Sequence, residues 1–118
     1  MDQIWEKARD IGRLVAQSDE YKALKRANER LADDREAVAG INRLTALQEG
    51  IGAALQRGEE PAEAEREEYE RVATGVQASP TYQAFEAARS NFDRLMMRID
   101  EEIAKGIEAG EKSRIILA

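Results

Sequence analysis

The chain has 118 residues, of which 42% are hydrophobic, 36% are charged and 5% are aromatic. This length and apolar content suit one domain with an aliphatic core, and abundant Glu, Lys, Arg and Ala with only two prolines predict an all-α protein. A formal net charge of −6 disfavours nucleic acid and anionic membranes as direct partners, and the lack of cysteine and histidine excludes disulfides, cysteine-bound metal clusters and imidazole chemistry.

The first predicted element is a short helix that ends near Gln17, with Asp2 as its expected N-cap. Ser18 is expected to cap a second helix at that point. Trp5 lies beside the apolar stripe, where it either closes the bundle or anchors a partner. The stripe recurs at spacings of four, three and four residues: Ile4, Ala8, Ile11 and Val15.

A long second helix is predicted over about residues 19 to 57, because no proline precedes Pro61 and apolar residues recur at helical spacing. Asp34 interrupts this apolar series. We interpret it as a polar group that fixes packing register or lies exposed at a bend, with a metal ligand as the alternative. The glycines Gly50 and Gly52 weaken the helix, so a break near Gly50 that folds the chain into a monomeric bundle is also an alternative.

The segment RGEEP, residues 57–61, predicts a turn, and a short third helix follows it. Ser79 and Pro80 mark the start of a long fourth helix, which we expect to close around Gly106 to Gly110. The predicted organisation is one all-helical domain, residues 1–110, in the order short, long, short, long, followed by a C-terminal tail, residues 111–118.

The second half of this pattern repeats the first at an offset of 61 residues. Ser18 corresponds to Ser79, and Tyr21 corresponds to Tyr82. Each half reads as a short helix, a serine cap and a long helix. Either an internal duplication or two similarly capped amphipathic helices accounts for the match.

The lengths of the predicted helices favour a homodimer. A helix of about 39 residues extends ~58 Å, whereas a compact chain of this size has a radius of gyration near ~13 Å. A second chain would cover the apolar seam that such a helix leaves in water. The predicted dimer or partner interface consists of Trp5, Leu31, Val38, Ile41, Leu44, Leu47, Phe92, Met96 and Ile99.

Two features suggest alternative functions. Carboxylate pairs spaced three apart between Glu59 and Glu70 could hold Mg²⁺ in an all-α nucleotide hydrolase, although a solvated acidic face or a docking surface explains them as well. Arginines on the long helices could contact phosphates, although acidic neighbours at helical spacing favour ordinary ion pairs: Arg26, Arg30, Arg89, Arg94 and Arg98.

The phrases QSDEYKALKRA, residues 17–27, and SPTYQAFEAA, residues 79–88, together with the segment Leu44 to Gln48, resemble the YlbF/YmcA family of small helical regulators. The likeness runs from about Ile4 to Ile107. It implies a dimerising protein without catalytic activity that works with other regulatory proteins in the control of competence, sporulation and biofilm formation and that affects an RNA-processing ribonuclease. Some members of those complexes hold iron–sulfur clusters through cysteines, which this chain lacks.

The predicted function is therefore that of a non-catalytic regulatory adaptor acting through protein contacts. We expect no cofactor and no metal, a homodimer or higher oligomer, and other regulatory proteins as partners. No window of the sequence approaches the roughly 18 apolar residues that span a bilayer, and we expect a cytoplasmic protein.

Overall fold

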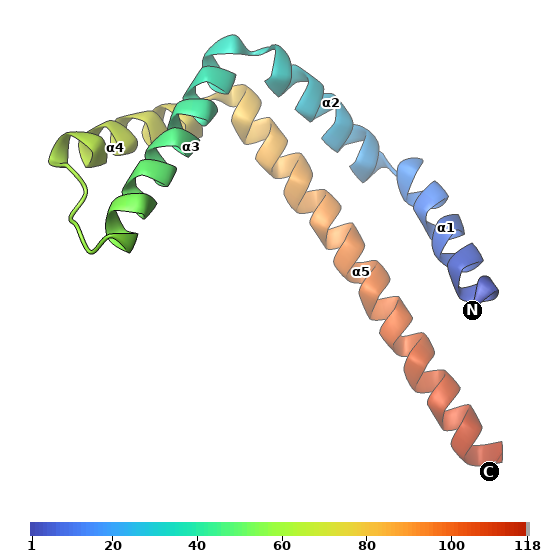
Figure 1. Cartoon of the computed structure of the whole chain (residues 1–118). Helices are drawn as coiled ribbons and strands as arrows, with labels where there is room; N and C mark the ends of the chain where they lie inside the picture. Colours follow the sequence, from blue (N-terminus) through green and yellow to red (C-terminus); the bar gives the residue numbers. More distant parts are fainter. Residues whose placement is uncertain (118) are drawn as a thin grey trace. The chain divides into compact units, whose positions relative to one another are not determined.

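The computed structural model describes residues 1–117, with side chains described as far as Lys112. In this part of the chain five α-helices and no strand are present (Figure 1). The helices are α1 (Asp2–Ala16), α2 (Asp19–Asp33), α3 (Arg35–Gln56), α4 (Glu63–Ala78) and α5 (Pro80–Leu117). The prediction of an all-α helical protein is confirmed.

Two serines begin helices as the sequence predicts. The backbone N–H of Tyr21 donates to Oγ of Ser18 at 3.1 Å, and that of Tyr82 donates to Oγ of Ser79 at 3.4 Å. A side-chain oxygen at this position satisfies one of the free N–H groups of the first turn. Asp2 was expected to act in the same way, but it lies inside the first turn of α1, and Met1 takes the N-cap position without a side-chain hydrogen bond.

The predicted continuous second helix is wrong, because the chain breaks at Asp34 into α2 and α3. Asp34 has an extended backbone, with φ −86° and ψ 94°, and its carboxylate accepts the N–H of Ala37 at 3.1 Å. In a continuous helix a backbone carbonyl would accept the N–H of Ala37. Here the carboxylate of Asp34 accepts it instead. Gly50 and Gly52, where the alternative break was expected, lie inside α3.

The helices α3 and α4 pack side by side as a helical hairpin (Figure 1). The turn predicted after Arg57 is confirmed, since Gly58 adopts a positive φ of 73°, a conformation that suits glycine. Gly40 permits a close approach of the two helices, because a Cβ atom there would lie 2.9 Å from Cγ2 of Val76. The buried side chains of the hairpin include Leu47 and Val76.

The fourth predicted helix is longer than expected. The helix α5 begins at Pro80 as predicted but continues for 38 residues to Leu117, so the expected end around Gly106 to Gly110 is wrong. A glycine inside a helix costs only about 1 kcal/mol relative to alanine, which is too little to end a helix by itself. The division into a domain at residues 1–110 and a tail at residues 111–118 stays a prediction.

The contacts divide the chain into two compact units. The first unit combines Met1–Leu24 with the chain from Ala88 onward, and the second unit is Lys25–Ala87. The first unit therefore contains α1 and most of α5, and the second contains the α3–α4 hairpin. At the 61-residue offset of the repeat, α1 corresponds to α4 and the distal part of α5 corresponds to α3.

Candidate protein-interaction surface

The helix α1 buries none of its residues. Its exposed apolar side chains include Ile4 at 59%, Trp5 at 54% and Leu14 at 67% exposed. Full burial of a side chain of this size stabilises by about 1.5–3 kcal/mol relative to leaving it in water. The apolar side chains of α1 are therefore largely exposed to solvent in the single chain.

Within the first unit, α1 and α5 border an open groove of about 520 Å³. Its lining is mostly apolar. The residues are Ile11, Leu14, Val15 and Ser18 from the N-terminal side and Leu95, Arg98, Ile99, Glu102 and Ile103 from α5. Apolar grooves of this kind are the usual receptors for an amphipathic helix.

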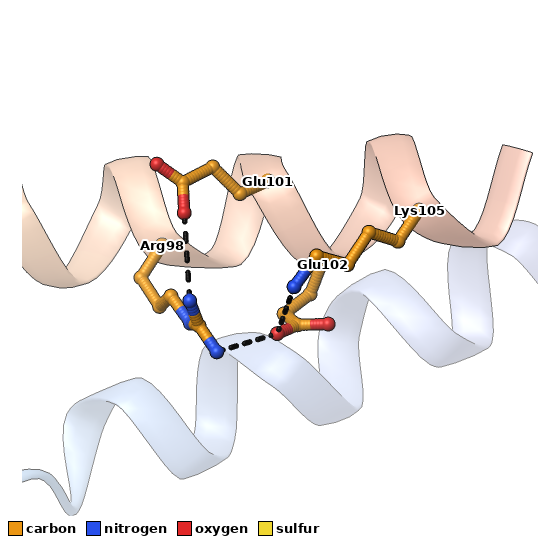
Figure 2. A network of polar contacts seen from close by, with 4 residues as sticks. All are labelled: Arg98, Glu101, Glu102 and Lys105. Atoms are coloured by element: carbon orange, nitrogen blue, oxygen red, sulfur yellow. Dashed lines mark hydrogen bonds and ion pairs between the residues drawn. The ribbon is translucent and has the colours of Figure 1, made fainter. Parts of the chain in front are cut away.

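A charged network runs along α5 beside this groove (Figure 2). Glu102 accepts contacts from Arg98 Nη2 at 2.9 Å and from Lys105 Nζ at 3.5 Å, and Arg98 also lies 3.6 Å from Glu101. Each of these side chains is more than half exposed, so the pairs are screened by water and add little stability. Their main effect is to make this stretch of α5 charged and hydrophilic.

The same positions in α3 are small or apolar. At the 61-residue offset the four charged residues of the network correspond, in order, to Ala37, Gly40, Ile41 and Leu44. In the hairpin this stretch lets α4 approach closely, as the contact between Gly40 and Val76 shows. The counterpart of Gly40 is Glu101, so α5 lacks at this position the small residue that permits close approach in the hairpin.

An aromatic pair lies in the first unit. The rings of Tyr21 and Phe92 have centroids 6.0 Å apart at an interplanar angle of 55°, a tilted arrangement that favours aromatic contact. Phe92 is one of the predicted interface residues, and the ring contact leaves it half-buried.

The predicted interface residues divide between the two units. In the first unit Trp5 and Met96 are exposed, and Phe92 and Ile99 are half-buried. In the second unit Leu31 and Leu47 are buried, and Val38, Ile41 and Leu44 are half-buried. The prediction omitted other exposed apolar residues on the same helices, of which Ile103 and Ile107 share the stripe of Ile99. The omitted residues are Ile4, Leu14, Met97, Ile103 and Ile107.

The acidic stretch of α4 has a specific partner. Glu68 accepts two hydrogen bonds from Arg43 of α3, each 2.7 Å long, and these bonds lower the pKa of Glu68 and raise the pKa of Arg43. Around the start of α4, Arg66 shares a shallow depression with glutamates of the same cluster. Among residues 1–112, for which side chains are described, no group of three or more carboxylates is placed to hold a metal ion.

Asp34 uses both carboxylate oxygens at the break between α2 and α3. Oδ1 accepts the N–H of Ala37, and Oδ2 accepts the hydroxyl of Thr81 at 2.6 Å. The bond from Thr81, followed by that from Ala37, lowers the pKa of Asp34. The interruption in the apolar series is thus a helix cap tied to the first turn of α5.

These features define a small all-helical protein that keeps an apolar groove open between two of its helices. The chain belongs to the YlbF/YmcA family: the family model described as control of competence regulator ComK, YlbF/YmcA, matches residues 4–108. The resemblance stated from the sequence is confirmed. No curated protein gives a significant match to the chain. Across the described helices, none has the length and hydropathy needed to cross a membrane.

Proposed function

We propose that this chain is a non-catalytic regulatory adaptor that acts through protein–protein contacts. Two observations support the proposal. The family is named for control of the competence regulator ComK, which is a regulatory description. The observation that carries the mechanism is the open groove between α1 and α5, whose lining is mostly apolar although both helices are richly charged.

The uncovered area is large for so small a protein. Leu14, Met97 and Ile107 are each more than 60% exposed, and Trp5 is more than half exposed. At about 25 cal/mol per Å² of apolar surface, covering this face with another helix stabilises the assembly substantially. A helix of 15 residues, the length of α1, runs about 22 Å, which is long enough to contribute to the roughly 800 Å² per partner of a standard interface.

We propose a second copy of the chain as the first occupant of this face, giving a homodimer, or a higher oligomer. The interface comprises the predicted residues, and the members that lie on the first unit without being buried are Trp5, Phe92, Met96 and Ile99. Leu31 and Leu47 are covered by the chain itself, so tests of the interface belong on the first unit.

The assembled protein then binds other regulatory proteins in the cytoplasm. By its family, we propose that the regulated processes are competence, sporulation and biofilm formation, with an effect on RNA processing. The charged outer faces of the helices select partners by complementarity, because charges at an interface govern specificity more than affinity.

One pair of substitutions tests the proposal. Leu14→Asp places a charge in the groove, whereas Leu55→Asp places the same charge at an equally exposed position on α3, outside the groove. Light scattering should give a dimer mass for the wild type and for Leu55→Asp and a monomer mass for Leu14→Asp. Capture from native cells with mass-spectrometric identification should recover regulatory proteins with the first two and lose them with the third. A monomeric wild type that captures nothing would overturn the proposal.

A further inference from the structure

The two halves of the chain contain segments of equal length but different structure. Together α2, Asp34 and α3 span 38 residues, the length of α5. At the 61-residue offset Asp19 corresponds to Pro80 and Gln56 corresponds to Leu117, which are the first and last residues of α5. The segment that is one helix in the second half is therefore divided in the first half.

The division lies at a residue that interrupts the apolar series. Asp34 corresponds to Leu95, which is half-buried inside α5. The apolar positions on either side match, since Leu31 corresponds to Phe92 and Val38 corresponds to Ile99. The first half thus keeps the apolar pattern of a continuous helix on both sides of the break.

The backbone at the break is one torsion away from a helix. The φ of Asp34, −86°, already lies in the helical region, whereas its ψ of 94° differs from the helical value of about −42°. Helical hydrogen bonding reaches the break from both sides: the N–H of Asp34 donates to Leu31 O at 3.1 Å, and the N–H of Val38 donates to Asp34 O at 2.9 Å. Rotation of one peptide plane would join the two helices.

The side chain of Asp34 holds the broken form. In a continuous helix the N–H of Ala37 would donate to the carbonyl of Asp33, but here it donates to Asp34 Oδ1. The hydroxyl of Thr81 binds the other oxygen, and it lies 3.0 Å from Oγ of Ser79, which itself caps α5. The bond to Ala37 exists only while ψ of Asp34 is extended, and the bond to Thr81 locks the carboxylate in that position.

We propose that Asp34 is a conformational latch: α2 and α3 interconvert between the broken form, in which the carboxylate binds Ala37 and Thr81, and one continuous 38-residue helix, in which it is released. In the continuous form the apolar series of both helices lines up as one stripe. The α3–α4 hairpin moves as a body, since the contact between Gly40 and Val76 lies within it. This change requires no partner, so it stands apart from the proposed adaptor role.

Distance measurement on the full-length chain tests the latch. The sequence has no cysteine, so Lys25→Cys with Glu49→Cys gives one clean pair of spin labels at exposed positions on α2 and α3. Along a continuous helix these positions are about 36 Å apart. The wild type should give a shorter distance, and Asp34→Leu, which installs the residue of the second half, should move the distribution to about 36 Å.

Two further variants separate the latch from a general loss of structure. Asp34→Asn retains a capping oxygen for the N–H of Ala37, and its amide NH2 can donate to the hydroxyl oxygen of Thr81, so it should keep the short distance. Thr81→Val removes the bond to Asp34 Oδ2 together with the contact to Oγ of Ser79, leaves the bond from Ala37 in place, and should add a minor population at about 36 Å. A folded Asp34→Leu protein, checked by circular dichroism, that keeps the wild-type distance would overturn the latch. If Asp34→Leu does not fold, the Thr81→Val variant is the test of the latch. A new population at the long distance would support the latch, and an unchanged distance distribution would overturn it.

Discussion

Glu68 of α4 binds Arg43 of α3 through two hydrogen bonds, each 2.7 Å long, and this pair joins the two helices of the hairpin across their exposed edge. A bidentate arrangement between a guanidinium and a carboxylate is the strongest form of this interaction. Glu68 therefore differs from the neighbouring glutamates of α4, because its charge is paired with Arg43 on another helix.

The pair predicts a pH dependence of stability. Arg43 holds the pKa of Glu68 below its ordinary value in the folded chain. A carboxylate with a lowered folded pKa stabilises the fold above its unfolded pKa, and this stabilisation is lost as the pH falls through the folded value. Glu68→Gln should therefore lower the melting temperature at pH 7, and the difference from wild type should shrink below the ordinary glutamate range.

The control for this effect is Glu67→Gln, which removes one carboxylate from the adjacent position of α4. We expect it to change the melting temperature less than Glu68→Gln at low salt. Equal effects of the two substitutions at pH 7 would mean that general charge repulsion, and not the pair with Arg43, sets the stability of the hairpin.

Gly40 and Gly52 predict opposite effects of the same substitution. Gly40→Ala places a Cβ 2.9 Å from a methyl group of Val76, a stiff and buried side chain, and overpacking of this kind costs about 1–3 kcal/mol. Gly52→Ala meets nothing within 4 Å and should stabilise α3 by about 0.5–1 kcal/mol through helix propensity. Urea unfolding should show the first variant less stable and the second more stable than wild type. Stabilisation by both would contradict the close packing of α3 on α4.

Trp5 provides an optical test of the proposed dimer. It is the only tryptophan, and it is 54% exposed in the single chain, so its emission should resemble that of a wet indole at low protein concentration. Dimerisation through the first unit should shift the emission to the blue as the concentration rises. The Leu14→Asp variant should remove the shift, and an emission maximum that is independent of concentration in the wild type would place Trp5 outside any interface.

Added Mg²⁺ should leave the melting temperature unchanged, with or without nucleotides. Glu68 is already neutralised by Arg43, and the remaining carboxylates at the start of α4 share their depression with Arg66. A rise in melting temperature on addition of Mg²⁺, followed by turnover of a nucleotide, would instead support the hydrolase alternative. Ca²⁺ at the same ionic strength is the matched control for a nonspecific salt effect.

The sequence predicts the helix starts well where a side chain has one clear role. Ser18 and Ser79 precede apolar periodic segments, and Gly58 stands between a helix and a proline, so local chemistry alone defines those boundaries. Asp34 is harder to interpret, because the sequence suggests a polar group that fixes packing register, exposure at a bend or a metal ligand, and not the helix cap that the structure shows. The extended backbone of Asp34 and its bond to the N–H of Ala37 define the cap, and Thr81, far away in the sequence, adds a second bond that the sequence pattern does not indicate.

The sequence predicts some residues of the candidate surface but not the groove. Helical periodicity identifies which residues of α1 and α5 share a stripe, and it predicts Phe92, Met96 and Ile99 on α5. The groove itself depends on which helices become neighbours in the first unit, and periodicity carries no information about that.

The buried aliphatic side chains of the described chain are four alanines, two leucines and one valine, a modest set for a protein of this length. Small side chains displace little water, so much of the folding free energy of the proposed assembly would come from association, which follows mass action. The abundance of the protein would then govern its own lifetime: scarce, unassembled copies would open more often and reach proteases first, so the cell could withdraw the regulator by lowering its synthesis.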